Sequence, residues 1–301
     1  MRPASARFPG SLALRAHPAK QGWARPAMAV GLGLAAGAIF LAERRAPLRR
    51  RGQAEPARTL RNLAMGALSM AVVAAVEGPV TRRLARHAEG RRRGLAQCLP
   101  LPAWARDAAA FLLMDYTIYL WHVLTHKVPA LWRLHLVHHI DLDLDASTAL
   151  RFHAVDMLVS VPWRAAQVAL LGVSPRALRA WQGFFFLSVL FHHSNLRLPA
   201  RLERVLALVL TTPRMHGIHH STVREETDSN WSSGLSFWDR LHGTFRLDVA
   251  QRDLRIGVPA YRDPAETALR PSLAMPFRAQ RDDWRPREAQ RLSRAPAQRG
   301  G

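Results

Sequence analysis

The sequence predicts an all-α integral membrane protein with about four or five helical spans. Two observations support this fold class. Several long apolar runs are separated by hydrophilic, basic segments, which is the pattern of helices that cross a bilayer. Histidines collect at the ends of these runs, so they would emerge on one face if the runs cross the membrane alternately. The chain is therefore expected to carry a histidine-rich cap on a helical membrane domain.

The N-terminal quarter of the chain contains the first two apolar runs. Residues 1–25 are rich in arginine, proline and alanine and are predicted to form a disordered basic arm. Run 27–42 is uncharged and approaches the roughly 20 residues that cross a bilayer. A cleavable signal peptide is the alternative, which the flanking arginines and the late start disfavour. With the second run, 63–76, residues 26–95 are predicted to form transmembrane helices with basic loops.

Three more apolar runs lie in the middle of the chain. Run 108–126 (AAAFLLMDYTIYLWHVLTH) ends in histidines, and so does the aromatic-rich run 177–195 (ALRAWQGFFFLSVLFHHSN). The run between them, 156–173, contains Pro162 and Arg164, which weaken it as a span because a charge is costly at membrane depth.

The C-terminal residues 247–301 form a polar, arginine-rich tail, which the composition predicts to be surface or disordered chain. A soluble protein with long core helices is the alternative to the membrane fold, since the mean hydropathy of the whole chain is near zero. The number of separate apolar runs favours the membrane protein.

The formal net charge is +21, and nearly all of it comes from arginine, since only Lys20 and Lys127 are lysines. Such a balance suits a nucleic acid or an acidic membrane surface. The chain has no zinc-finger spacing and no basic stripe interleaved with aromatic residues, so no nucleic-acid partner is predicted. Cys98 is the only cysteine, which excludes an intrachain disulfide and a cysteine-ligated iron–sulfur cluster.

Twelve of the 14 histidines fall between residues 122 and 242. Three clusters have helical spacing, in which residues three and four apart share a face: HVLTH at 122–126, HLVHH at 135–139 and HGIHH at 216–220. Each His-x-x-His-His pentad can direct two rings toward one site and give the third ring to a neighbouring site. A lone histidine is more often an ordinary core or surface residue, but three such clusters indicate metal binding.

The number and type of candidate ligands indicate two metal ions. Imidazole suits zinc, copper, iron and nickel, and a single zinc ion needs only four ligands. HVLTH lacks the glutamate of HExxH zinc proteases, and the chain lacks the Glu-x-x-His motif of soluble di-iron bundles. The pattern therefore predicts a di-metal cap built mainly from imidazoles.

The ordered pattern HxxxH, HxxHH and HxxHH resembles the membrane fatty acid hydroxylase and sterol desaturase superfamily, and its bacterial members in particular. The resemblance covers about residues 107–246 and extends to STALRFHAVD, FHHSNLRLP, TPRMHGIHHSTVREETDSN and WDRLHGTF. It implies a catalytic domain in which two iron ions activate O2 as co-substrate. The C–H bond attacked would belong to a membrane lipid, a fatty acyl chain or a sterol-like substrate. Zinc can replace the iron during purification.

The resemblance also implies which side chains hold the metal. Nine histidines match the ligand positions: His122, His126, His135, His138, His139, His193, His216, His219 and His220. His153, in an Arg-x-His motif, is a further candidate as a ligand or as a partner of ligands, whereas His192 is read as an additional, unligated histidine. Five polar residues match positions that can orient the ring nitrogens facing away from metal: Asp115, Asp156, Asn195, Asn230 and Asp239. Helix capping or ordinary polar packing is the alternative for each of the five.

Four residues depart from the usual family pattern. The chain has Asn230-Trp231-Ser232 where Asn-Tyr-Gly is usual, His242 where an apolar aromatic residue is usual, and Asp156 where glutamate is common. These departures leave the metal core intact and put the shape of the substrate pocket in doubt.

The segment DLDLD, residues 141–145, is similar to the start of a calcium loop. Its sixth position is Ala146 rather than glycine, and its twelfth is Phe152 rather than glutamate. The segment is therefore predicted to be a polar turn between the helices that carry the histidines.

An O2-dependent lipid hydroxylase or desaturase is the function that these observations favour. A non-enzymatic membrane metal-binding or transport protein is the second hypothesis, and it predicts ligands spread along a pore rather than grouped at helix ends. A zinc hydrolase is the third, and it would need a general base for which the sequence offers no candidate.

Two further expectations concern partners and orientation. The sequence has no GxGxxG fingerprint after a strand and no CxxCH haem-attachment motif, so a separate electron-donor protein is predicted. Segments 44–61 and 82–93 are both arginine-rich, and the alternation of spans places 44–61 with the histidines. The histidine clusters are therefore predicted on the cytoplasmic face of a bacterial inner membrane.

Overall fold

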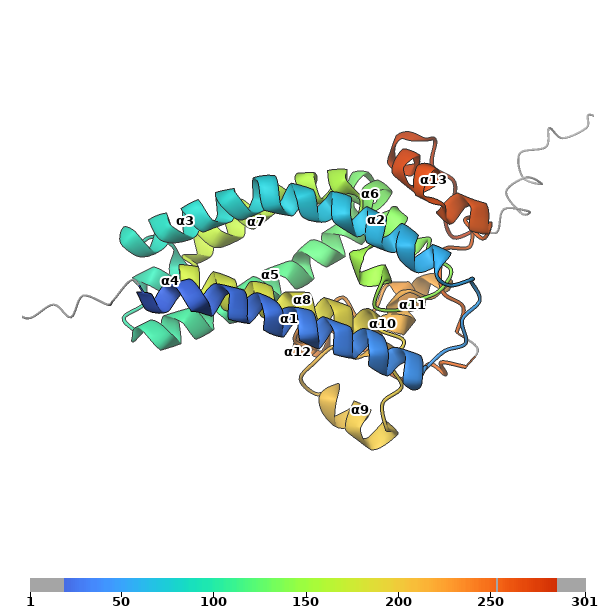
Figure 1. The fold of residues 1–301 in the computed structure, drawn as a ribbon, viewed down its shortest axis with the longest axis horizontal. Coiled ribbons are helices and arrows are strands. Elements are labelled where there is room, and N and C mark those ends of the chain that lie inside the picture. The colour runs from blue at the N-terminus through green and yellow to red at the C-terminus, as the bar shows by residue number, and fades with distance from the viewer. Residues whose placement is uncertain (1–18, 253, 286–301) are drawn as a thin grey trace, which may run out of the picture.

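The protein is described here by a computed structural model, which covers residues 19–252 and 254–285 (Figure 1). Within these residues the chain is helical, with three isolated β-bridges and no strand. The predicted all-α fold is therefore confirmed. Most of the predicted basic arm, residues 1–18, lies outside the described residues, and the first helix begins at Ala19.

Four segments are long and apolar enough to cross a membrane: Ala27–Arg45, Ala57–Cys98, Ala103–Lys127 and Ala154–Leu171. The elements that build them are α1 (Ala19–Arg45), the series α2 (Ala57–Val72), η1 (Val73–Glu77), α3 (Gly78–Gly90) and α4 (Leu95–Cys98), then α5 (Ala103–Lys127) and α7 (Ala154–Leu171). The run that contains Pro162 is thus one of the four, and its helix continues through the proline. The fifth predicted run forms α8 (Pro175–His193), which packs along α5 without being one of the four. The predicted membrane fold with four or five spans is confirmed.

The long helices form two layers with α5 between them. Figure 1 shows α2, η1, α3 and α7 along one side and α1 and α8 along the other. Apolar side chains from several helices fill the space between the layers, among them Met114 of α5, Val168 of α7 and Trp181 of α8. Arg164 of α7 places its guanidinium 5.4 Å from the Trp181 ring centroid. This cation–π contact partly compensates the cost of a charge at membrane depth.

The layers meet closely at the end of the molecule remote from the histidines. Gly94 and Gly172 both have positive φ angles, 88° and 70°, and a side chain on either would overlap the backbone of the other. Glycine tolerates this conformation because it has no Cβ. The two glycines therefore allow the turn before α4 to approach the left-handed end of α7.

Short helices form the other end of the molecule, where the candidate site lies. They are α6 (Pro129–His139), η2 (Thr148–Leu150), α9 (Ala200–Leu206), α10 (Pro213–His219), α11 (Arg224–Thr227) and α12 (Phe237–Leu241). Both α6 and α10 begin with a proline, whose fixed φ suits the first turn of a helix. Thr212 caps α10 by accepting a bond from the Met215 amide. The N-terminal residues of α6 and α10 therefore fix the direction of each histidine-bearing helix.

The C-terminal segment differs from its prediction as surface or disordered chain. Residues 254–285 include η3 (Pro264–Thr267), α13 (Leu269–Ala274) and η4 (Met275–Phe277). Val258, Tyr261 and Met275 are buried against Leu136 and Val137 of α6. The few apolar residues of this arginine-rich stretch therefore cover the outer face of a histidine-bearing helix. Residues 286–301 lie outside the described residues.

Candidate metal centre

The predicted ligands come from four helices whose ends meet at one place. His122 and His126 lie on the last turns of α5, and His193 ends α8. The pentad 135–139 forms the second half of α6, and the pentad 216–220 occupies α10 and the residue after it. Helices that are far apart in sequence thus bring all nine candidate histidines together.

The nine histidines form two adjacent groups of four with a ninth ring beside them. The ligand nitrogens within each group lie within 4.8 Å of one another. The first group is His122, His126, His139 and His219, and the second is His138, His193, His216 and His220. His135 forms a further set with His138 and His139, one from each group.

Each pentad contributes to both groups, as its helical spacing allows. Residues 216 and 220, one turn apart, point to the second group, whereas His219 points to the first. On α6 the adjacent residues His138 and His139 diverge by roughly 100° around the helix axis, so each reaches a different group. The repeated spacing therefore serves two neighbouring sites held between α6 and α10.

The second group shows how closely the imidazole nitrogens converge. Nε2 of His193 lies 3.0 Å from Nε2 of His138 and 3.0 Å from Nε2 of His216. Nε2 of His220 lies 3.2 Å from Nε2 of His216. Four imidazole nitrogens that converge at these distances have the arrangement of ligands around one cation. A shared cation would satisfy all of them.

Backbone carbonyls fix the tautomer of three rings. The Nδ1 atoms of His122, His193 and His219 lie 2.7, 2.8 and 2.9 Å from the carbonyl oxygens of Trp231, Val189 and Ser229. A carbonyl can only accept, so each Nδ1 carries the proton and each Nε2 presents its lone pair inward. These are the tautomers that a metal ion requires.

Burial favours the neutral form of four of the candidate ligand rings. It lowers the pKa of His139, His216 and His220 well below the ordinary histidine value, and it lowers the pKa of His219 to about 3. The proximity of the other histidines lowers these pKa values further. Neutral imidazole is the form that binds metal.

The first group has buried nitrogens with no hydrogen-bond partner among the described residues. They are Nε2 of His126, His139 and His219, together with Nε2 of the neighbouring His135. An unpaired polar atom at this depth destabilises the fold unless an unseen partner satisfies it. Convergent lone pairs, neutral rings and unpaired nitrogens together fit two metal ions coordinated mainly by imidazole.

Only one of the five predicted orienting residues approaches a candidate ligand ring. Asp156 Oδ2 lies 3.7 Å from His135 Nδ1. Asp239 instead accepts bonds from the amides of Trp231 and Ser232 at 2.8 and 3.1 Å. Because the Trp231 carbonyl faces His122, Asp239 acts on that ring through the backbone.

Asp115, Asn195 and Asn230 also hold backbone segments. Asp115 Oδ2 accepts bonds from the Leu235 amide and the Trp238 indole at 3.0 and 2.8 Å. Asn195 exchanges two bonds with the Arg49 backbone. Asn230, at φ 52°, donates to the carbonyls of Met215 and Arg246. The backbone carbonyls that face the histidine rings could not be predicted from the sequence, because every residue has a backbone carbonyl.

The remaining histidines of the region lie outside the two groups. His153 caps α7 by accepting from the Val155 amide at 3.1 Å, and its Nε2 lies 3.2 Å from the Leu273 carbonyl. His192 is buried with its ring centroid 4.1 Å from that of His216. His242 is exposed and lies 3.2 Å from the Tyr116 hydroxyl.

The DLDLD segment is a buried anchor. Arg58 of α2 pairs with Asp145 and, at 2.8 Å, with Asp141, and both carboxylates are buried. Asp143 accepts bonds from the amides of Gly52 and Gln53. The segment therefore ties the end of α6 to the start of α2 and to the loop between α1 and α2. The sequence predicted a polar turn between the histidine-bearing helices, and the structure shows that this turn also connects them to α2 and to the loop after α1.

The fatty acid hydroxylase family matches residues 108–244, the part of the chain that carries both histidine groups. Over this stretch the chain is similar to the fatty acid hydroxylases. The predicted family resemblance is thereby confirmed, and the nine candidate ligands all lie within the matched residues.

Relatives that match this stretch are named for different lipids. Ornithine lipid hydroxylase OlsE of Rhizobium tropici is 31% identical over 148 residues, which are 49% of this chain and 44% of the relative. Human alkylglycerol monooxygenase is 30% identical over 140 residues, 46% of this chain and 30% of the relative. The cholesterol 25-hydroxylase-like protein of Danio rerio is 30% identical over 149 residues, 47% of this chain and 55% of the relative.

The chain thus spans about a third to a half of the length of these relatives. No solved structure matches the chain.

Proposed function

We propose that this protein is an O2-dependent oxidoreductase that hydroxylates or desaturates a membrane lipid, a fatty acyl chain or a sterol-like molecule. The observation that carries the proposal is the pair of buried four-histidine groups, side by side at the ends of apolar helices. The names of the relatives support the reaction class, since they are hydroxylases and a monooxygenase.

The proposed ligands are the nine histidines 122, 126, 135, 138, 139, 193, 216, 219 and 220, with iron as the native metal. Iron suits a site of this kind because it can change oxidation state, which zinc cannot. When bound, the iron pair supplies the activation of O2 that an unactivated C–H bond requires. Neutral, buried imidazoles around the pair would exclude water and keep the ligand nitrogens deprotonated.

The reaction balances only with electrons from outside the domain. In hydroxylation one oxygen atom enters the C–H bond and the other leaves as water, which takes two electrons and two protons. We propose that a separate electron-donor protein supplies the electrons, because the sequence shows no motif for a flavin, haem or iron–sulfur group.

The grouping of the ligands supports the enzyme over a transport protein. A transport pathway would need ligands distributed along the spans, whereas both groups lie between α6 and α10 at one end of the long helices (Figure 1). The carboxylates nearest the rings have structural tasks: Asp239 holds two backbone amides, and Asp156 faces the outer nitrogen of His135. Neither is placed as the general base that a zinc hydrolase would use.

We further propose that the histidine end faces the cytoplasm of a bacterial inner membrane. The loop between α1 and α2 lies with the histidines, since the Leu48 amide donates to the Asn195 carbonyl at 2.7 Å. This loop belongs to the arginine-rich segment 44–61, and basic segments near span ends tend to stay in the cytoplasm.

Lipid profiling tests the function. The chain would be expressed in cells that lack it, and the lipid extract compared with that of cells expressing the His138→Ala variant. Hydroxylation adds one oxygen atom to a lipid, and desaturation removes two hydrogen atoms. Growth under isotopically labelled O2 should label the hydroxylated product. Identical lipid profiles in the two strains, with equal protein levels and supplied reductase, would refute the proposal.

A further inference from the structure

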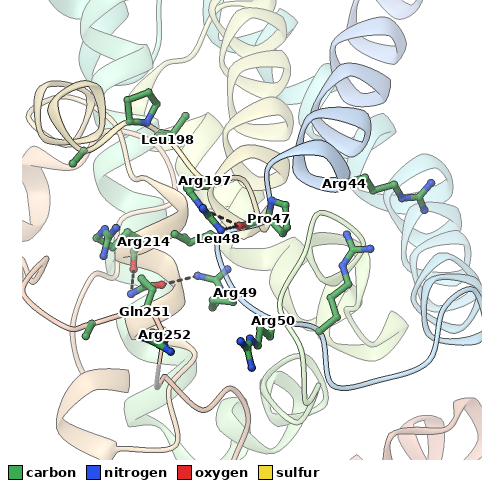
Figure 2. Close-up of a pocket in the computed structure, with 14 residues that line it drawn as sticks. Arg44, Pro47, Leu48, Arg49, Arg50, Arg197, Leu198, Arg214, Gln251 and Arg252 are labelled. Carbon is green, nitrogen blue, oxygen red and sulfur yellow. Dashed lines mark hydrogen bonds between the residues drawn. The ribbon is translucent and has the colours of Figure 1, made fainter.

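A basic cavity lies near the ends of α1 and α8 and the start of α10, and none of the candidate ligand histidines lines it (Figure 2). Its volume is about 910 Å³, and it is bounded by the loop after α1, the turn before α9, the start of α10 and the residues around 251. Seven arginines line it, and none of the described lining residues is acidic: Arg44, Arg49, Arg50, Arg51, Arg197, Arg214 and Arg252. A concave surface with so many like charges attracts anions strongly.

Four of these arginines form no ion pair with a described residue, although the charges of Glu43 and Arg51 interact. Arg44, Arg50, Arg51 and Arg252 are exposed, and no acidic side chain among the described residues forms an ion pair with them. Arg214 differs from these four because it pairs with Glu203 at 3.0 Å, which fixes its position in the lining of the cavity. The exposed guanidinium groups are therefore available for a ligand.

Arg49 provides a second, independent observation. It is only 7% exposed, it lines the cavity, and its Nε atom has no hydrogen-bond partner among the described residues. Its Nη1 atom donates to Gln251 at 2.7 Å and to the Pro213 carbonyl at 3.2 Å. A buried guanidinium with a free donor is a costly feature that an anionic ligand would stabilise.

The position of the cavity identifies the kind of anion. Arg44 lies in the last turn of α1, where the candidate span Ala27–Arg45 ends, so the cavity opens at the level of the membrane surface. Next to the cavity, α9 and the turn after it carry four exposed apolar side chains: Leu202, Val205, Leu208 and Val209, which are 46%, 62%, 61% and 54% exposed. An apolar surface of this kind suits the acyl region of a bilayer.

We propose that this cavity binds the phosphate of an anionic glycerophospholipid. Arginine pairs bidentately with phosphate oxygens, and several arginines can share one phosphate. The acyl chains would extend past Leu198 and the apolar face of α9 into the bilayer. Arg49 joins the bound phosphate to the histidine-bearing helices, because it contacts the carbonyls of Ser194 and Pro213.

Binding of dioctanoyl phosphatidylglycerol to the purified full chain in an uncharged detergent tests the site. The variant Arg50→Gln/Arg252→Gln removes two exposed guanidinium groups that form no hydrogen bond or ion pair with a described side chain. Two lost charge-assisted contacts should weaken binding by about tenfold or more. The control Arg83→Gln/Arg86→Gln removes two exposed arginines of α3 and should change the affinity less than about twofold. Equal elution and melting temperature would show that both variants fold.

Three comparisons separate a lipid from other anions. Dioctanoyl phosphatidylcholine, which has no net charge, and glycerol phosphate, which has no acyl chains, should both bind more weakly than phosphatidylglycerol. Arg50→Lys/Arg252→Lys should restore part of the affinity, since lysine keeps the charge but not the fork of donors.

Unchanged phosphatidylglycerol affinity in the Arg50→Gln/Arg252→Gln variant would overturn the proposal. Glycerol phosphate that binds as tightly as the lipid would assign the cavity to a soluble phosphate compound instead. An acidic ferredoxin that loses binding to this variant while the lipid does not would assign the cavity to a protein partner.

Discussion

Replacing Arg58 by methionine should destabilise the protein strongly, because it leaves two carboxylates buried without their main counter-charge. Asp141 is 1% exposed and Asp145 is 4% exposed, and both pair with Arg58. Burial would raise the pKa of Asp141, but the charges of Arg58 and Arg151 outweigh burial and lower it to about 2. The carboxylate is therefore held ionised by its partners.

The expected loss of stability follows from the pKa of Asp141 and from the burial of its ion pair with Arg58. The pKa of Asp141 falls from 3.8 to about 2 in the folded protein, which corresponds to about 2 to 3 kcal/mol of stability at neutral pH. Because the folded pKa is depressed, this contribution is present above about pH 4 and is lost as the pH falls toward 2. Removing one partner of a buried pair costs roughly 3 to 5 kcal/mol in all.

The assay is unfolding of the purified protein in detergent, followed by tryptophan fluorescence at a fixed heating rate. At neutral pH, Arg58→Met should lower the melting temperature by about 6 to 20 °C. In the variant, the pKa of Asp141 should rise above its ordinary value. Protonation of Asp141 should then remove the free-energy cost of burying its charge without a partner. The difference in melting temperature between the variant and the native protein should therefore decrease as the pH falls from 7 toward 4.

A matched control separates this effect from the loss of any arginine. Arg83 is exposed on α3 with no ion-pair partner among the described residues, so Arg83→Met should change stability by less than about 0.5 kcal/mol. The reasoning would be refuted if Arg58→Met were no less stable than Arg83→Met, or if its deficit were the same at pH 7 and pH 4. Since Asp141 follows His139 by two residues, the variant should also lose bound metal.

Four further predictions concern the metal content, the metal ligands, the topology and the electron supply. Protein from iron-replete cells should contain close to two iron ions per chain by elemental analysis, and a value of one or less that iron does not raise would contradict a di-iron site. His138→Ala and His219→Ala, one from each group, should each abolish activity with little further loss in the double variant. Reporter fusions after Gly52 and after Asn195 should report the cytoplasm, and a fusion after Arg91 should report the opposite side of the membrane. If the reporters after Gly52 and Asn195 lie on different sides, the proposed topology is excluded. Reconstituted protein with lipid, O2 and NAD(P)H should turn over only when a reductase and a ferredoxin or small haem protein are added, so sustained turnover without them would reveal an internal redox site.

The sequence by itself determined the local features. Apolar runs of near-spanning length predict helices wherever they occur, because the bilayer leaves backbone groups no partner outside the segment. Helical spacing also determined that each pentad presents rings in two directions. The candidate ligands could therefore be named from spacing and family resemblance, and all nine meet in the structure.

The tertiary structure decided which ring joins which group. His138 and His139 are neighbours in sequence, but histidines of α8 and α10 meet the ring of His138, whereas histidines of α5 and α10 meet the ring of His139. The carbonyls that set the tautomers belong to Trp231, Val189 and Ser229, whose side chains have no part in the contact. A contact made by backbone atoms leaves no trace in residue type, so the sequence could not reveal it.

Long-range packing also decided the role of segments whose composition pointed elsewhere. The arginine-rich stretch 254–285 folds because Val258, Tyr261 and Met275 find an apolar partner surface on α2 and α6. DLDLD is an anchor because Arg58, more than 80 residues earlier, reaches its carboxylates. Composition measures the average polarity of a segment, whereas burial depends on whether its few apolar groups, or its charges, meet a complementary surface from elsewhere in the chain.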